Sequence, residues 1–158
     1  MIVGLGVDLC DVERMRRALE GPAGTRFRAR VFTPAEQEYC EARRRGRFAS
    51  YAARFAAKEA AMKALGTGWG RGVAWRDFEV LPAADGPPGL AVRGEAARVA
   101  ARRGVTRWLV ALSHTDTGAV ASVIAEGARL RGVRAGGAAA RPRVGGGGSR
   151  PRPPRARR

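Results

Sequence analysis

The order of hydrophobic and polar residues along the first 127 positions predicts a domain that contains both helices and strands. Residues 2–9 form the short apolar run IVGLGVDL, which is typical of a buried strand. Residues 47–65 carry the longest helical pattern, because apolar residues recur there every three or four positions. We expect further helices over 12–20, 34–44 and 95–103, and strands over 73–81, 89–92, 105–113 and 118–125.

Capping signals mark several of these helix ends. Asp11 is a plausible N-cap for the first helix. Thr33, Pro34 and Glu36 read as a capping box with proline at the first helical position. Gly66 follows the long helix where a left-handed C′ residue belongs. The order of elements indicates an α+β fold, and the closing hairpin, with its turn near residues 115–118, implies antiparallel pairing.

The charge of the chain is unevenly distributed. The 158 residues carry a formal net charge of +16, and residues 128–158 hold ten arginines and no acid. This segment is rich in Gly and Pro and poor in large apolar residues, so we expect a disordered tail. We therefore predict one folded domain over 1–127 and a tail over 128–158.

The cysteine content and the apolar runs exclude several classes of protein. Cys10 and Cys40 match neither a disulfide framework nor a zinc signature. No run of about 18 apolar residues is present, so no membrane span is predicted. The N-terminus lacks the basic region of a signal peptide. A reducing, cytoplasmic location is the simplest interpretation.

The long helix contains the most informative acidic residue. Glu59 falls within a stripe that also holds Phe48, Ala52, Phe55 and Met62. A carboxylate in an apolar stripe must be paired, protonated or bound to a metal. A second face holds Ala53, Ala57, Ala60 and Ala64 and is suited to close helix packing, while a third face holds Arg54 and Lys58.

Two interpretations of Glu59 follow from the pattern. It can pair with Lys63 one turn later. It can also combine with Asp8, at the end of the first strand, to supply carboxylate oxygens to Mg²⁺. The neighbouring lysines fit an anionic, phosphate-bearing substrate, which backbone N–H groups after the helix could contact, at Gly66, Thr67 and Gly68.

Three segments carry a resemblance to a known family: GLGVDLCDVERM, RFAAKEAAMKALGTG and LSHTDTGAVASVI. They resemble the holo-acyl-carrier-protein synthases, the short form of the 4′-phosphopantetheinyl transferases. The resemblance covers residues 1–127 and implies that family's fold, an antiparallel sheet packed on a long central helix. It implies transfer of phosphopantetheine from coenzyme A to a serine of apo-acyl-carrier protein, with Mg²⁺, releasing adenosine 3′,5′-bisphosphate. It also implies a homotrimer with active sites between subunits.

The resemblance assigns roles to individual residues. Asp8 and Glu59 match the two Mg²⁺ ligands, and Lys63 matches a lysine near the coenzyme A diphosphate. His114, the single histidine, matches a residue near the nucleotide, although a lone histidine is more often a hydrogen-bonded structural residue. Arg14 and Arg26 match basic residues that meet the acidic carrier protein. Further positions around the coenzyme are matched by Arg54, Lys58, Gly66, Thr67 and Gly68.

Several alternatives stay open at this point. Glu59 and a metal-bound water are the candidate bases for the serine proton, and His114 is a third candidate that we expect to bind rather than to act as the base. The high positive charge also fits a nucleic-acid-binding protein, although residues 1–127 show no nucleic-acid-binding motif. A structural trimer without activity would leave Asp8 and Glu59 unexplained. The sequence does not distinguish a fatty-acid carrier from a polyketide carrier.

Overall fold

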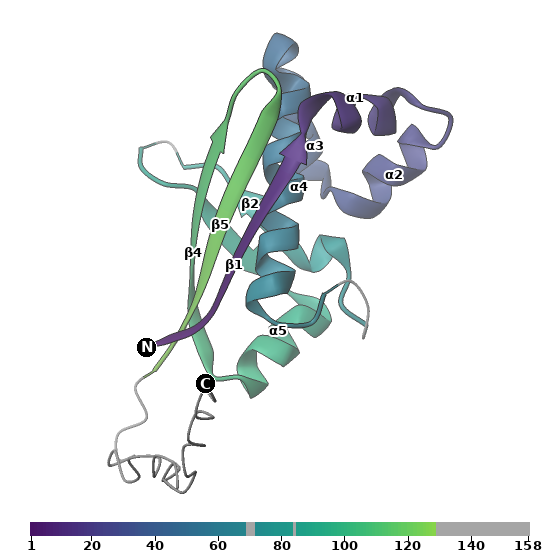
Figure 1. Cartoon of the computed structure of the whole chain (residues 1–158). Helices are drawn as coiled ribbons and strands as arrows, with labels where there is room; N and C mark the ends of the chain where they lie inside the picture. The colour runs from purple at the N-terminus through teal and green to yellow at the C-terminus, as the bar shows by residue number, and fades with distance from the viewer. Residues whose placement is uncertain (69–71, 84, 129–158) are drawn as a thin grey trace, which may run out of the picture.

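One long helix lies against one face of a three-stranded antiparallel sheet (Figure 1). The helix is α4 (Arg47–Ala64), and the strand order is β1-β5-β4. The strands are β1 (Ile2–Asp11), β4 (Val105–His114) and β5 (Gly118–Gly127). The architecture is the expected α+β fold with an antiparallel sheet on a central helix. The computed structural model describes residues 1–68, 72–83 and 85–128.

The contact between β1 and α4 depends on two glycines. A Cβ added to Gly4 or Gly6 would lie 3.0 Å or less from the carbonyl groups of Ala64 and Ala60, respectively. Glycine therefore lets the strand backbone approach the helix backbone directly. The small-residue face of α4, which the sequence marks as suited to close helix packing, packs closely against strand β1 at Ala60 and Ala64.

Four short helical elements separate β1 from α4. They are α1 (Val12–Glu20), α2 (Gly24–Val31), α3 (Pro34–Ala42) and the 3₁₀ turn η1 (Arg44–Gly46). The α2 helix was not predicted, because its sequence GTRFRARV is strongly basic and has no side-chain N-cap. Tertiary contact holds it instead, through buried Val31 and through Gly24, which leaves no room for a side chain beside Leu19.

The predicted helix caps are confirmed. The Asp11 side chain accepts a hydrogen bond from the Arg14 N–H at 2.6 Å. Thr33 and Glu36 form the reciprocal capping box. Gly66 adopts a φ of +61°, which is left-handed and favours glycine. The α3 helix ends at Ala42, earlier than the predicted position 44.

The second half of the described chain adds a small second sheet. It is formed by β2 (Phe78–Leu81) and β3 (Gly89–Val92), which pair antiparallel. The strand predicted over 73–81 is shorter than expected, because η2 (Trp75–Asp77) is a 3₁₀ turn. The α5 helix (Gly94–Arg102) then leads into the β4–β5 hairpin.

The chain ends of the folded region meet at the bottom of the sheet. The Met1 ammonium donates to the Gly127 carbonyl at 2.8 Å, and the Gly127 N–H donates to the Met1 carbonyl at 2.9 Å. Of the predicted tail over 128–158, all but Ala128 lies outside the described residues. None of the helices in the described ranges is long and apolar enough to cross a membrane.

Candidate active site

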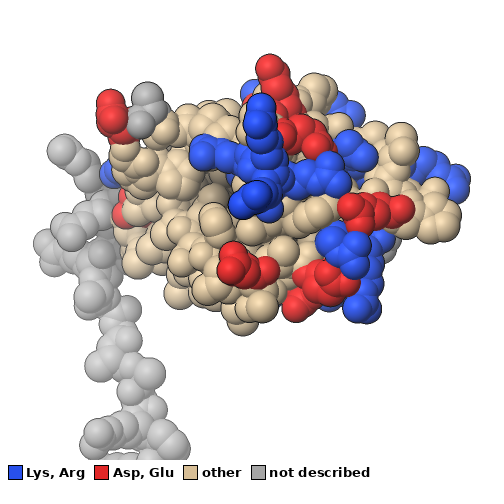
Figure 2. All heavy atoms as spheres, turned by 90° about the horizontal axis from the view of Figure 1, so that it is seen from above, with Lys and Arg blue, Asp and Glu red and all other residues tan. Residues whose placement is uncertain are grey.

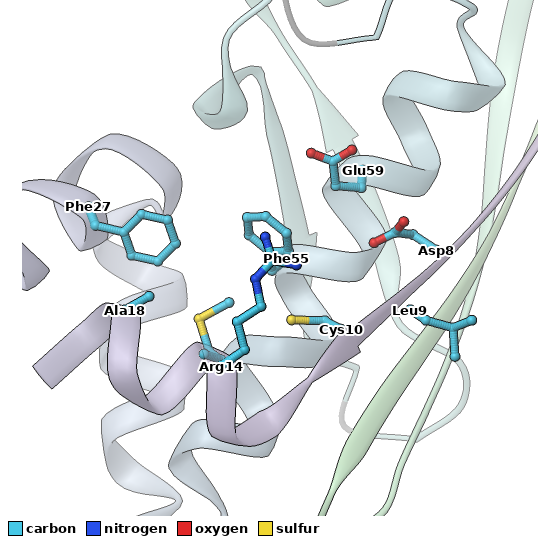
Figure 3. A pocket seen from close by; sticks show the side chains of 9 residues that line it. Asp8, Leu9, Cys10, Arg14, Ala18, Phe27, Phe55 and Glu59 are labelled. Carbon is cyan, nitrogen blue, oxygen red and sulfur yellow. The ribbon is translucent and has the colours of Figure 1, made fainter. Parts of the chain in front are cut away.

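Asp8 and Glu59 line the same cavity, whose volume is about 320 Å³ (Figure 3). Asp8 comes from the last part of β1, and Glu59 from the middle of α4. The close approach at Gly6 places the two elements side by side, so that carboxylates 51 positions apart in the sequence share one space.

The electrostatics of the two carboxylates differ. The Lys63 ammonium lies 2.7 Å from Asp8 Oδ1 and also donates to the Val7 carbonyl at 3.0 Å. Within the described residues, Glu59 has no ion pair or side-chain hydrogen bond. Burial raises the pKa of Glu59, the negative charge of Asp8 raises it further, and Lys63 opposes both effects. The alternative in which Glu59 pairs with Lys63 is therefore wrong, because Lys63 pairs with Asp8.

This arrangement of carboxylates fits a hard divalent cation. Asp8 and Glu59 place two carboxylate groups around one cavity, and the pKa of Glu59 is raised first by its burial and then by the negative charge of Asp8. Mg²⁺ typically takes one or two protein carboxylates and completes its octahedron with water and substrate phosphates. No group of three or more His, Cys, Asp and Glu side chains suited to a metal is found among the described residues. The protein can thus supply part of the coordination shell, and a phosphate-bearing substrate the rest.

The other side of this cavity is aromatic and apolar. Phe27 of α2 and Phe55 of α4 line it, with ring centroids 6.3 Å apart. Trp75 of η2 stacks behind Phe55 at 4.8 Å, with an angle of 25° between the rings. Sequence reasoning noted Phe55 only as part of a stripe and did not identify Phe27, because Phe27 belongs to the unpredicted helix α2. The remaining apolar side chains that line the cavity are Leu9, Cys10, Met15 and Ala18.

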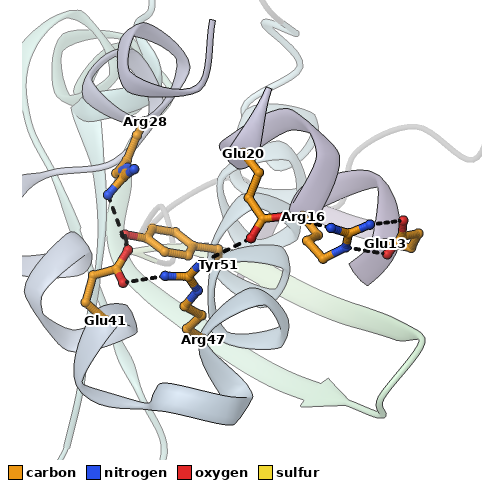
Figure 4. Close-up of polar contacts among 7 residues, drawn as sticks. All are labelled: Glu13, Arg16, Glu20, Arg28, Glu41, Arg47 and Tyr51. Atoms are coloured by element: carbon orange, nitrogen blue, oxygen red, sulfur yellow. Dashed lines mark hydrogen bonds and ion pairs between the residues drawn. The ribbon is translucent and has the colours of Figure 1, made fainter. Parts of the chain in front are cut away.

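Arg14 also lines this cavity, from α1 (Figure 3). Its guanidinium forms no ion pair with the described residues, and neither does that of Arg26, which is exposed on α2. Other arginines nearby are paired. Figure 4 shows a chain of ion pairs that links α1, α4, α3 and α2 through Glu13, Arg16, Glu20, Arg47, Glu41 and Arg28.

A second cavity, of about 480 Å³, brings together Arg54 and His114. Arg54 is only 5% exposed, and its guanidinium lies 3.8 Å from the centroid of the Tyr39 ring. The buried Nε of Arg54 has no hydrogen-bond partner. His114, at the end of β4, is exposed. Sequence reasoning did not identify Tyr39 and Arg43, which also line this cavity.

Basic side chains gather at the end of the molecule where α3 leads into α4. Figure 2 looks down on this end and shows Lys and Arg side chains near the centre of the face. The exposed arginines of this turn are Arg43, Arg44 and Arg45, and Arg44 has an unusual φ of 46°. The turn therefore presents positive charge close to the second cavity, where Arg43 is part of the lining.

Three of the predicted coenzyme contacts are already engaged within the chain. The Lys58 side chain is 0% exposed and pairs with Glu36, so it cannot touch a bound coenzyme in this structure. The N–H groups of Gly66 and Thr67 donate to the carbonyls of Lys63 and Met62, at 2.9 and 3.2 Å. Those two N–H groups close the helix, so they are not free to bind phosphate.

Comparison with known proteins identifies the same family as the sequence motifs. The family model of the 4′-phosphopantetheinyl transferase superfamily matches residues 4–121. The holo-[acyl-carrier-protein] synthase of Desulforudis audaxviator (strain MP104C) is 54% identical over 127 residues, which cover 80% of this chain and 95% of that protein. The corresponding protein of Anaeromyxobacter dehalogenans (strain 2CP-C) is 53% identical over 130 residues, covering 81% and 98%.

Solved structures agree with the sequence comparison. The crystal structure of the holo-[acyl-carrier-protein] synthase from Neisseria meningitidis superposes with a TM-score of 0.71 at 30% identity, covering 80% of this chain and 99% of that one. The Bacillus anthracis str. Ames synthase, in complex with coenzyme A (3′,5′-ADP), gives a TM-score of 0.66 at 31% identity, covering 81% and 99%. The chain therefore belongs to the holo-[acyl-carrier-protein] synthases, enzymes of the 4′-phosphopantetheinyl transferase superfamily.

Proposed function

We propose that this enzyme transfers 4′-phosphopantetheine from coenzyme A to a serine hydroxyl of an apo-acyl-carrier protein and releases adenosine 3′,5′-bisphosphate. The observation that supports this most directly is the shared cavity of Asp8 and Glu59, with Lys63 bound to Asp8 at its edge. Phosphoryl transfer requires positioning and stabilisation of charge more than covalent chemistry. The cavity offers oxygen ligands for a cation and an ammonium group within one site.

We assign Asp8 and Glu59 as the residues that hold Mg²⁺. When bound, the ion supplies positive charge that stabilises the phosphoryl oxygens of the diphosphate. Lys63 adds a second positive charge, and its half-exposed side chain can turn from Asp8 toward a phosphate oxygen. Two acceptors are available for the serine proton, the Glu59 carboxylate and a water in the cavity.

The second cavity supports a binding site for the nucleotide part of coenzyme A. The Arg54 guanidinium is buried, and its Nε lacks a partner, so a phosphate oxygen would satisfy it. His114 and Arg43 line the same cavity and add donors. Gly68 stays in the proposed set of coenzyme contacts, whereas Lys58 and the backbone N–H groups of Gly66 and Thr67 are withdrawn from it.

A homotrimer with active sites between subunits is part of this proposal. The Asp8 cavity and the Arg54 cavity share no lining residue within the chain, so one coenzyme could bridge two subunits. Strand β1 also leaves large apolar side chains uncovered, with Leu5 61%, Val7 45% and Leu9 76% exposed. Such a patch is typical of an interface between proteins.

The proposed carrier-protein contacts are Arg14 and Arg26. Both guanidiniums are free of ion pairs within the described residues and are available to an acidic partner. Arg14 also reaches the cavity that would receive the serine, which connects docking to the reaction. A cytoplasmic location, where apo-carrier proteins are made, is a prediction that accompanies this function.

The test is to incubate the full-length chain with coenzyme A, Mg²⁺ and an apo-carrier protein, and to weigh the carrier by mass spectrometry. We expect a mass increase of one phosphopantetheine and the appearance of adenosine 3′,5′-bisphosphate. The Glu59→Gln variant is the matched control and should give almost no product. An unchanged carrier mass together with salt-dependent DNA binding would instead support the nucleic-acid-binding alternative.

A further inference from the structure

Lys58 is the most completely buried charged group on α4. Its side chain is 0% exposed, and its ammonium has three acceptors. These are Glu36 Oε2 at 2.7 Å, the Phe78 carbonyl at 2.5 Å and the Trp75 carbonyl at 3.2 Å. An ammonium has three N–H donors, so its hydrogen-bonding capacity is fully used inside the protein. Burial lowers the pKa of Lys58, and the nearby Glu36 opposes that shift.

The partner carboxylate is equally well satisfied. Glu36 is 1% exposed, accepts the Thr33 N–H at 2.9 Å through Oε2, and accepts the Val80 N–H at 2.9 Å through Oε1. The Lys58–Glu36 pair therefore joins the start of α3, the middle of α4 and the strand β2. A buried ion pair is weak evidence for stability, because well-packed apolar side chains of similar volume often serve as well. What the pair does provide is a fixed position of α3, α4 and β2 relative to one another.

The element fixed by Lys58 is the 3₁₀ turn η2. The carbonyls of Trp75 and Phe78, which both accept from Lys58, lie at the start of this turn and just after its end. The Trp75 ring stacks on Phe55, and Phe55 lines the cavity of Asp8 and Glu59. The contacts therefore run from the buried ammonium through η2 to the aromatic wall of the cavity.

We infer that Lys58, held by Glu36, is a positioning residue that sets the aromatic wall formed by Trp75, Phe55 and Phe27. The inference rests on the proposed function, because this wall faces the space where the carrier serine would enter. Phe27 lies on α2 next to Arg26, so carrier docking and the wall share one helix. The groups proposed to hold the coenzyme, Lys63 and Arg54, lie outside the wall.

This arrangement predicts an effect on the carrier substrate that a general loss of stability would not produce. Lys58→Met removes both hydrogen bonds to η2, so Trp75 loses its fixed position and Phe55 its support. We expect the KM for the carrier to rise and kcat/KM to fall by about tenfold, while the KM for coenzyme A changes by less than about twofold. A purely structural loss reduces the fraction of active enzyme, so it lowers kcat and leaves both KM values unchanged.

The control is Arg93→Met. This change removes the ion pair of Arg93 with Glu79, which is 9% exposed and lies on β2 beside Phe78. It thus leaves a buried glutamate without its partner on the same strand, while both hydrogen bonds of Lys58 to η2 and Phe78 stay in place. We expect a lower melting temperature with both KM values unchanged. A similar rise in the carrier KM for Arg93→Met would overturn the inference.

A double-mutant cycle tests the route through Trp75. Trp75→Ala should reproduce the rise in carrier KM, and Lys58→Met added to it should change kcat/KM by no more than about twofold. If the two effects instead multiply, Lys58 does not act through Trp75 and the inference fails. It also fails if Lys58→Met leaves the carrier KM at the wild-type value. If Lys58→Met does not fold, the double variant Lys58→Met/Glu36→Leu, which removes both charges of the buried pair, is used instead.

A spectroscopic readout separates this inference from the proposed function. The near-UV circular dichroism of Trp75 depends on its stacking against Phe55. In the wild-type background, subtracting the spectrum of Trp75→Ala should leave a signal from Trp75. In the Lys58→Met background, the spectra with and without Trp75→Ala should be the same. A persistent difference spectrum would show that Lys58 does not hold Trp75. If the wild type transfers no phosphopantetheine, the proposed function is wrong, and the spectrum still decides whether the pair positions the ring.

Discussion

The contact between β1 and α4 should tolerate no side chain at Gly6. A Cβ added there would lie 2.8 Å from the Ala60 carbonyl carbon and 2.9 Å from the Ala64 nitrogen, where ordinary contact begins near 3.4 Å. Gly6→Ala therefore forces the strand and the helix to separate by about 0.6 Å or more. Overpacking of this kind costs about 1–3 kcal/mol, which corresponds to a fall of roughly 5–10 °C in melting temperature.

The same displacement should reduce activity, because Asp8 and Glu59 lie on the two elements that move apart. A misplacement of about 1 Å can cost roughly a hundredfold in rate, so we expect turnover to fall by at least about tenfold. The assays are thermal unfolding followed by circular dichroism and carrier modification followed by mass spectrometry. Gly118→Ala on β5 is the control, since its added Cβ meets nothing within 4 Å. Wild-type stability and turnover for Gly6→Ala would refute the reasoning.

Five further predictions concern the site and the tail. Glu59→Gln should reduce transfer by at least about a hundredfold. Burial raises the pKa of Glu59, so the metal-free wild type should lose stability relative to Glu59→Gln as the pH rises through that raised pKa. Urea unfolding midpoints of the two proteins measure this, and a difference between the midpoints that stays constant with pH would contradict it. Arg14→Gln should raise the KM for the carrier by about threefold or more at low salt and less at high salt, in steady-state assays. Burial raises the pKa of the Cys10 thiol from 9.0 to about 11. Iodoacetamide should therefore alkylate Cys10 at pH 8 about a hundredfold more slowly in the native protein than in the urea-unfolded protein, as measured by mass spectrometry. Deleting residues 128–158 should leave turnover at saturating carrier unchanged at two salt concentrations, because the sheet already closes between Met1 and Gly127.

Local sequence signals predicted the helix caps correctly and singled out the two candidate carboxylates. Asp11, the Thr33–Glu36 box and Gly66 act through contacts within a few residues, so their chemistry can be read from the sequence. Glu59 was noticeable because a carboxylate in an apolar stripe needs an explanation. Asp8 was noticeable because a nearby residue already capped the helix. The structure places both in one cavity, a result of tertiary packing that periodicity does not describe.

The features that were missed all depend on distant parts of the chain. The α2 helix lacks a capping side chain and is held by contacts to α1 and the core, so its own eight residues give little signal. Lys58 follows the same pattern as Arg54 along α4, and the sequence grouped them on one face. Their environments differ because Lys58 meets Glu36 and two carbonyls of η2, whereas Arg54 lies beside a cavity.

Charge provides the clearest example of this limit. Helix α1 presents Arg14, Arg16 and Arg17 within four residues, and composition treats them alike. Arg16 lies 2.8 Å from Glu13, and Arg17 lies 2.9 Å from the same carboxylate, so both are partly neutralised within the helix. Arg14 has no such partner among the described residues and reaches the active-site cavity. A docking surface on α1 should therefore depend on Arg14 more than on its neighbours. The matched change Arg17→Gln should raise the carrier KM less than Arg14→Gln does, and an equal effect of the two would show that net charge, not the position of Arg14, attracts the carrier.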